Sequence, residues 1–93
     1  MNVLYKRVSK LTQHNDKQLL NKEYYDLIIE DKCSGTIPFF ERDGGKKILK
    51  LLNDNQITSL NIPTMDRIAR NEIDVLNTIT YFNKKGVYIN FIQ

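Results

Sequence analysis

The chain has 93 residues, a length that suits one compact domain and leaves no room for two. Its composition, 41% hydrophobic and 27% charged with no low-complexity tract, is typical of a folded globular domain. No apolar run approaches the roughly 20 residues that span a bilayer, and the start lacks the pattern of a secretory signal. We therefore expect a cytoplasmic protein without a membrane partner.

A single cysteine, Cys33, and a single histidine, His14, give no internal disulfide and no cluster for a structural zinc site. We therefore expect neither a metal nor another cofactor. The net charge of +3 permits binding to a polyanion without requiring it, so charge alone does not choose the partner.

Short strand-like runs alternate with helix-like runs along the chain, a pattern typical of an α/β fold with parallel crossovers. The first half predicts a strand over residues 2–8, a short helix over 17–25 and a second strand over 26–30. A loop over 33–45 is rich in glycine and proline, and a helical spacing resumes over 46–53. Loops of this composition are often functional.

The second half predicts a third strand over residues 57–62, which ends near Pro63 because proline supplies no ladder N–H group. Asn71 is expected to cap the last helix, and Gly86 to end it. An apolar stripe is predicted along that helix at Ile73, Leu76, Ile79 and Phe82. A fourth strand over 87–92 completes a mainly parallel sheet of about four strands, flanked by three helices.

Polar residues follow the predicted strands, at the sheet edge where open parallel sheets bind ligands. Arg7 and Ser9 come at the end of the first strand, Asp31 and Ser34 follow the second, and residues 66–70, Asp-Arg-Ile-Ala-Arg, follow the third. Arg42 could reach the same place from the loop. A serine among arginines suits phosphoryl transfer, because guanidinium groups bind phosphate oxygens in pairs and stabilise the charge of the transition state.

Taken together, the motifs resemble the catalytic domain of the serine site-specific recombinases of the resolvase/invertase family. They are Tyr-Lys-Arg-Val-Ser at residues 5–9 with Gln13 and Gln18, Asp-Lys-Cys-Ser-Gly at 31–35, Arg42, Asp-Arg-Ile-Ala-Arg at 66–70, and Gly-Val at 86–87. The resemblance covers essentially the whole chain in order and approximate spacing. It implies a three-layer α/β domain that acts on DNA within a dimer, or within a tetramer during synapsis.

The resemblance also implies a metal-free mechanism, in which Ser9 attacks a DNA phosphate and forms a 5′-phosphoserine link that is later rejoined. On this basis Arg7, Arg42, Arg67 and Arg70 bind the scissile phosphate, and Asp66 orients arginines or assists proton transfer. Supporting roles fall to Gln13, Gln18, Asp31 and Ser34. Members of the family continue into a long dimerisation helix and a DNA-binding domain, so residues 1–93 are expected to be a single catalytic domain that lacks both. The pattern does not choose among resolution, inversion, integration and transposition.

Other interpretations of the same residues stay open. The fold could serve as a non-catalytic module that binds other subunits or nucleic acid without cutting. Ser9 could merely cap a connection, and Asp31 is expected to support the turn at Ser34 and Gly35 rather than to act in catalysis. A small phosphate-binding protein is disfavoured because no Gly-x-Gly-x-x-Gly or P-loop sequence is present. A hydrolase triad is disfavoured because His14 lies in a polar stretch without a nucleophile elbow.

Overall fold

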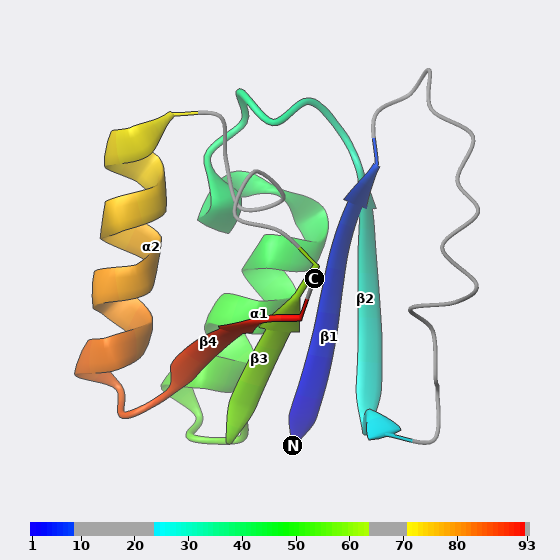
Figure 1. The fold of residues 1–93 in the computed structure, drawn as a ribbon, viewed down its shortest axis with the longest axis vertical. Coiled ribbons are helices and arrows are strands. Elements are labelled where there is room, and N and C mark those ends of the chain that lie inside the picture. The colour runs from blue at the N-terminus through cyan, green and yellow to red at the C-terminus, as the bar shows by residue number, and fades with distance from the viewer. Residues whose placement is uncertain (9–23, 64–70, 93) are drawn as a thin grey trace.

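The computed structural model describes residues 1–8, 24–63 and 71–92. In this part of the chain, four parallel strands form one sheet in the order β2-β1-β3-β4 (Figure 1). Their bounds are β1 Asn2–Val8, β2 Leu27–Lys32, β3 Ser59–Ile62 and β4 Tyr88–Phe91. The predicted α/β class and the mainly parallel four-stranded sheet are confirmed.

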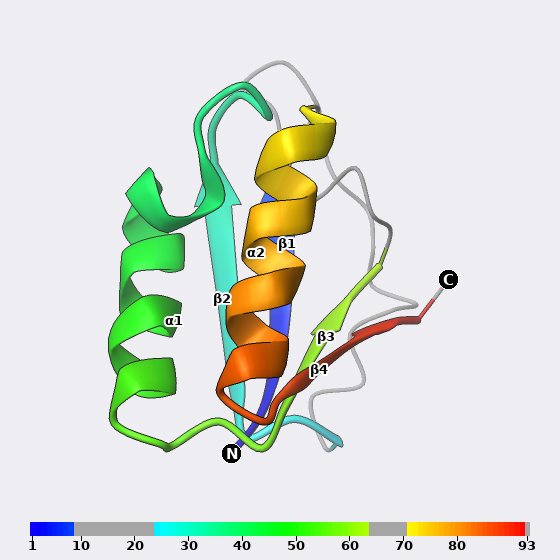
Figure 2. The ribbon, with the colours of Figure 1, turned by 90° about the vertical axis from the view of Figure 1, so that its left-hand side faces the viewer.

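Two α-helices and one short 3₁₀ helix connect the described strands. The 3₁₀ helix η3, Phe39–Glu41, leads directly into α1, Asp43–Asn53, and α2, Glu72–Lys84, links β3 to β4. Figure 2 shows α1 and α2 side by side over the sheet. Residues 17–23 of the predicted first helix lie outside the described residues. None of the helices described is long and apolar enough to cross a membrane.

The hydrophobic core lies between the two helices and one face of the sheet. Because strand side chains alternate between faces, Val3 and Tyr5 of β1 point to the same side as Ile29 of β2 and Leu60 of β3. These residues form one buried cluster with Phe39, Ile48, Leu52 and Phe82 of the helical layer. The centroid of the Tyr5 ring lies 4.8 Å from that of Phe39 in an edge-to-face contact, which connects β1 to η3.

Helix α2 begins and ends where local sequence signals predict. The Asn71 side chain accepts hydrogen bonds from the backbone N–H groups of Ile73, at 2.8 Å, and Asp74, at 3.4 Å, as an N-cap does. At the other end Gly86 adopts φ +79°, the left-handed conformation that commonly terminates a helix and that glycine tolerates best.

The predicted apolar stripe of α2 is wrong at two positions. Ile73 and Leu76 are 68% and 64% exposed, whereas the buried face consists of Val75, Thr78 and Phe82. Thr78 is tolerated inside because its hydroxyl donates to the backbone carbonyl of Asp74 at 2.7 Å. The rotation of the helix about its axis is therefore set by how Phe82 packs in the core and not by the longest run of apolar spacing.

Helix α1 starts earlier than predicted, at Asp43 instead of Lys46. Gly44 and Gly45 were interpreted as part of a turn, but both are buried in the first turn of the helix. A Cβ atom on Gly45 would lie 1.7 Å from the carbonyl oxygen of Phe39, and one on Gly44 would lie 2.5 Å from Cγ2 of Ile29. The two glycines thus allow α1 to approach η3 and β2 closely.

The ends of three strands differ from the prediction. Strand β2 extends to Lys32, two residues beyond its predicted end, because it stays paired with β1 up to Val8. Strand β3 begins at Ser59 and not at residue 57, and β4 is shorter than predicted by one residue at each end. As a consequence Asp31 lies within β2, opposite Arg7, and not in the loop that follows.

Candidate active site

The sheet order identifies the edge at which a site would form. Strands β1 and β3 are adjacent in the middle of the sheet, with β2 on one side and β4 on the other. Open parallel sheets bind ligands beyond the carboxyl ends of such central strands, where the connections leave toward opposite sides. Ser9 follows β1 directly, and Asp66, Arg67 and Arg70 follow β3. These four residues, with Gln13 and Gln18, lie outside the described part of the chain.

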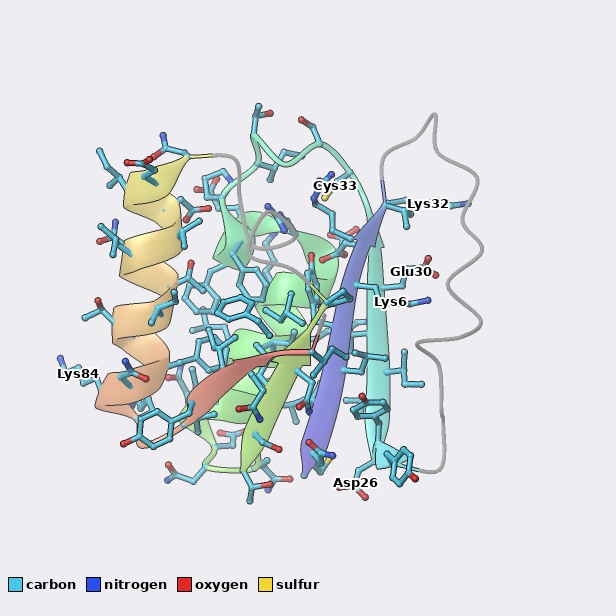
Figure 3. All side chains as sticks on the ribbon, viewed as in Figure 1. Lys6, Asp26, Glu30, Lys32, Cys33 and Lys84 are labelled. Carbon is cyan, nitrogen blue, oxygen red and sulfur yellow. The ribbon has the colours of Figure 1, made fainter. Side chains whose placement is uncertain are left out.

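Arg7 lies at the carboxyl end of β1, with its side chain on the face that carries the core. It is only 4% exposed, and its Nη1 donates a hydrogen bond of 3.0 Å to the carbonyl oxygen of Cys33. Figure 3 shows Cys33 just beyond the carboxyl end of β2. Arg7 therefore bridges from the strand before Ser9 to the segment that follows β2.

Arg42 is the residue that caps the start of α1, and it is only 2% exposed. Its Nε donates to the carbonyl oxygen of Ile37 at 2.9 Å, and its Nη2 lies 3.5 Å from that of Gly35. The guanidinium also lies over the Phe39 ring, 5.6 Å from its centroid. Arg42 thus sits in a hydrogen-bonded segment between η3 and α1, and not within a long loop over residues 33–45 as predicted.

Tyr5 and Asp31 connect Arg42 to the sheet. Nη1 of Arg42 donates to the Tyr5 hydroxyl at 3.1 Å, and that hydroxyl donates to Oδ2 of Asp31 at 2.8 Å. The other carboxylate oxygen of Asp31 accepts the backbone N–H of Gly44 at 2.7 Å. One chain of hydrogen bonds therefore runs from Arg42 through Tyr5 and Asp31 to the first turn of α1.

The expected support of the Ser34–Gly35 turn by Asp31 is not what these contacts show. The two described hydrogen bonds of Asp31 go to Tyr5 and Gly44, because the longer β2 places its side chain in the core layer beside α1. Ser34 is exposed and bonds locally: its Oγ lies 2.8 Å from Oγ1 of Thr36 and accepts the Thr36 N–H at 3.1 Å. These local hydrogen bonds stabilise the turn without a contribution from Asp31.

Burial governs the protonation of the two weak acids beside the arginines. Burial raises the pKa of Tyr5 far above its ordinary value; Arg42 opposes the shift, and the hydrogen bond and charge of Asp31 add to it. Burial also raises the pKa of the Cys33 thiol, against the lowering effect of the Arg42 charge. Tyr5 is therefore a neutral donor at physiological pH, and Cys33 is a thiol and not an activated thiolate.

The structure thus brings together Arg7, Arg42 and Asp31 of the predicted site residues, and it places the Ser34 side chain outside their cluster. A hollow of about 350 Å³ opens beside them, lined partly by Asp31, Cys33 and Arg42. Tyr5 was quoted in the sequence motif without a role. Strand periodicity could have singled it out, because a tyrosine on the same buried face as Arg7 needs a partner for its hydroxyl.

No group of three or more histidine, cysteine, aspartate or glutamate side chains able to hold a metal ion occurs among residues 1–8, 24–63 and 71–92. The polar character of the cluster comes instead from guanidinium groups. Guanidinium groups bind phosphate oxygens with paired N–H donors, and the described donors of Arg7 and Arg42 go to oxygens of the protein itself.

Comparisons with known proteins identify the family and the fold. A family model described as "Resolvase, N terminal domain" matches residues 2–93. The fold is similar to the C-terminal catalytic domain of ISC1926 TnpA, an IS607-like serine recombinase, with a TM-score of 0.83 at 24% identity over 99% of this chain and 67% of that one. No match was found among curated proteins.

Two further solved structures have the same fold. A serine recombinase from Sulfolobus solfataricus has a TM-score of 0.77 at 28% identity, over 99% of this chain and 69% of that one. The N-terminal catalytic domain of TP901-1 integrase has a TM-score of 0.79 at 17% identity, over 98% of this chain and 75% of that one. The chain spans about two thirds to three quarters of the length of these structures. With a family model matched over residues 2–93 and serine recombinase catalytic domains as its structural neighbours, the chain belongs to the resolvase family of serine recombinases.

Proposed function

We propose that this domain cuts and rejoins DNA as the catalytic domain of a site-specific recombinase, with Ser9 as the nucleophile. The observation that carries the proposal is the match to the resolvase family over residues 2–93, combined with the placement of Arg7. Arg7 is buried at the end of the strand that leads directly to Ser9. A guanidinium at that position is suited to bind the phosphate that Ser9 would attack.

In the proposed reaction, the Ser9 hydroxyl oxygen forms a bond to phosphorus and loses its proton. The bond between phosphorus and the 3′ oxygen of the neighbouring nucleotide breaks, and that oxygen leaves with a proton as a 3′-hydroxyl. The 5′ end of the cut strand is then linked to Ser9 as a phosphoserine. Rejoining is the reverse reaction with a 3′-hydroxyl as the nucleophile, so one ester bond replaces another and no nucleotide cofactor is consumed.

The arginines would stabilise the charge that develops on the phosphate oxygens in the transition state. Arg7 acts from β1, Arg42 from the start of α1, and Arg67 and Arg70 from the segment after β3. Asp66 orients these arginines or assists proton transfer. Gln13, Gln18 and Asp31 support the site, whereas the Ser34 side chain bonds to Thr36 and lies outside the described cluster. The adjacency of β1 and β3 favours this arrangement, because the chain leaves both strands at neighbouring points of the sheet.

The proposed substrate is duplex DNA, bound by an assembly of two subunits that becomes four during synapsis. The catalytic domain is C-terminal in ISC1926 TnpA and N-terminal in TP901-1 integrase. A DNA-binding region could therefore precede or follow this domain in a longer chain. The protein is therefore assayed at its full natural length.

The test is a covalent adduct assay on DNA selected for binding to the protein. Duplexes are selected from random sequence by binding to the protein, a nick is placed to trap the cleaved strand, and products are separated on a denaturing gel. The natural protein is compared with Ser9→Ala and with Ser59→Ala, a serine at the amino end of β3, away from the site. We expect an adduct that Ser9→Ala abolishes and Ser59→Ala retains.

The absence of an adduct on a duplex that the oligomer demonstrably binds would contradict the proposal. It would favour the alternative of a resolvase-fold module that binds DNA or other subunits without cutting. An adduct that persists in Ser9→Ala would support DNA cleavage by this domain but would show that another residue is the nucleophile.

A further inference from the structure

Tyr5 is a buried polar group that the proposed reaction does not use. Its side chain is fully buried, with 0% exposure, although it carries a hydroxyl that must be hydrogen-bonded at such a position. The hydroxyl lies between two charged groups, the guanidinium of Arg42 at 3.1 Å and the carboxylate of Asp31 at 2.8 Å. Phenylalanine would fill the same space, so the hydroxyl needs an explanation other than packing.

The donors and acceptors allow only one direction for this chain of hydrogen bonds. A guanidinium can only donate, so the Tyr5 oxygen accepts from Arg42 and its proton must point to Asp31. Asp31 is held in turn by the backbone N–H of Gly44 in the first turn of α1. Burial keeps the pKa of Tyr5 above its ordinary value, so the hydroxyl keeps the proton that this arrangement requires.

Packing fixes the Tyr5 ring independently of its hydroxyl. The centroids of the Tyr5 and Phe39 rings lie 4.8 Å apart in an edge-to-face contact. The Arg42 guanidinium lies over the Phe39 ring, 5.6 Å from its centroid. Removal of the hydroxyl alone would therefore leave the ring in place. It would remove one of the groups that fix the direction of the Arg42 side chain.

Tyr5 also lies close to the proposed reaction along the chain. It precedes Arg7 by two residues on β1, so both side chains point to the same face of the sheet. The same strand ends at Val8, directly before Ser9. Through Tyr5, the strand that leads to the proposed nucleophile is hydrogen-bonded to the segment that carries Arg42.

We propose that Tyr5 is a positioning residue of the recombinase site, whose hydroxyl, held by Asp31, fixes the guanidinium of Arg42 relative to the strand that bears Arg7 and leads to Ser9. The consequence for cleavage rests on the proposed function; the positioning of Arg42 does not. An arginine that must meet a transferring phosphate gains from such fixing, because displacement of a catalytic group by about 1 Å can cost on the order of 100-fold in rate.

The test compares Tyr5→Phe with a matched variant, Tyr81→Phe. Tyr81 also donates its hydroxyl to a side chain, Oδ1 of Asn53 at 2.6 Å, but it joins α2 to α1 at the exposed side of the core. Both variants lose one tyrosine hydroxyl; Tyr5→Phe loses the hydrogen bonds with Arg42 and Asp31, and Tyr81→Phe loses the one to Asn53. A general loss of stability would therefore appear in both, whereas a loss of Arg42 positioning would appear only in Tyr5→Phe.

The first measurement follows the Arg42 Nε–H group by NMR in the full-length protein without DNA. This N–H donates to the carbonyl oxygen of Ile37, so its exchange with solvent reports whether the guanidinium stays in place. We expect exchange to be about tenfold faster or more in Tyr5→Phe and unchanged in Tyr81→Phe. Equal exchange in Tyr5→Phe and the natural protein would overturn the inference, whatever the protein does to DNA.

The second measurement is the single-turnover rate of adduct formation at saturating DNA, per folded molecule, together with the Kd for the same duplex. We expect Tyr5→Phe to slow cleavage about 10- to 100-fold while the Kd stays within about twofold, because the hydroxyl acts on the transition state through Arg42 and not on DNA affinity. A normal rate for Tyr5→Phe, with a Ser9-dependent adduct in the natural protein, would refute the role of Tyr5 and leave the proposed function standing. No adduct from the natural protein would refute the proposed function, and the exchange measurement would still decide whether Tyr5 positions Arg42.

Discussion

Replacement of Asp31 by asparagine tests whether the buried polar cluster contributes to stability as its geometry indicates. The carboxylate accepts the Tyr5 hydroxyl on one oxygen and the Gly44 N–H on the other. Asparagine keeps one acceptor oxygen and presents an NH₂ group in place of the second. One of the two donors therefore loses its partner, and the NH₂ group cannot replace the lost acceptor.

The expected loss of stability is about 2 to 4 kcal/mol. A hydrogen bond to a charged group contributes about 1.5 to 3 kcal/mol, and leaving a buried donor unsatisfied carries a cost of similar size. The negative charge at the start of α1 adds about 0.3 to 1 kcal/mol, because it interacts with the unpaired N–H groups of the first turn. For a domain of this length, each kcal/mol corresponds to about 4 to 8 °C in Tm.

The assay is urea unfolding followed by circular dichroism, with Asp54→Asn as the matched control. Asp54 is exposed at the carboxyl end of the same helix, where a negative charge gains nothing from the helix dipole. We expect Asp54→Asn to change the free energy of unfolding by less than about 0.5 kcal/mol. A loss in Asp31→Asn no larger than in Asp54→Asn would refute the assignment of stabilising bonds to Asp31.

Three other predictions follow from packing and protonation. Gly45→Ala is expected to lower the free energy of unfolding by more than about 3 kcal/mol, because its Cβ would lie 1.7 Å from a backbone carbonyl oxygen. The Cβ of Gly86→Ala meets no atom within 4 Å, so this variant should cost only about 1 to 2 kcal/mol for its positive φ. Equal losses by urea unfolding would contradict this prediction. Phe82→Ala should cost about 3 to 5 kcal/mol and Leu76→Ala less than about 0.5 kcal/mol in the same assay, and the reverse order would contradict the observed buried face of α2. Because the pKa of Tyr5 is raised in the folded state, the protonated hydroxyl contributes fully to stability below about pH 10, and this contribution is lost as the pH rises above that value. If the free energies of unfolding of the natural protein and Tyr5→Phe changed equally with pH up to about pH 11, the prediction would be contradicted.

Local signals in the sequence were sufficient for much of the fold. The bounds of β1 are those predicted, and the cap at Asn71 and the stop at Gly86 are confirmed. Each of these features depends on residues near one another in the chain: an apolar run, an amide that reaches the next turn, a glycine that adopts positive φ. Such interactions form with little help from the rest of the molecule, so the sequence pattern alone predicts them.

Features that depend on distant contacts were predicted less well. The sequence cannot distinguish a glycine in a turn from a glycine that lets two elements approach, and Gly44 and Gly45 are of the second kind. Similarly, Ile73 and Leu76 match a helical stripe, but Phe82 and Val75 determine which side of α2 faces the core. In both cases the deciding atoms belong to another element, which local periodicity does not report.

For the candidate site, the motif predicted which residues gather but not how they are bonded. Arg7, Asp31 and Arg42 do lie together at the carboxyl ends of β1 and β2. Their partners, however, are backbone carbonyls of residues 33–37, the Tyr5 hydroxyl and the Gly44 N–H, and of these only Tyr5 could be singled out from strand periodicity. The proposed roles of Ser9, Gln13, Gln18, Asp66, Arg67 and Arg70 stay predictions.

The bonding of Arg42 shows that a motif residue proposed for the chemistry also serves the fold. A guanidinium that is 2% exposed must satisfy its donors inside the protein, and Arg42 does so with the carbonyl oxygen of Ile37 and the hydroxyl of Tyr5. A variant of Arg42 would therefore lose stability even if it never touched DNA, and loss of activity in it would not identify a catalytic group. Tyr5→Phe separates the two roles, because it keeps the arginine and the packing of the ring and removes only the Tyr5 hydroxyl, with its hydrogen bonds to Arg42 and Asp31.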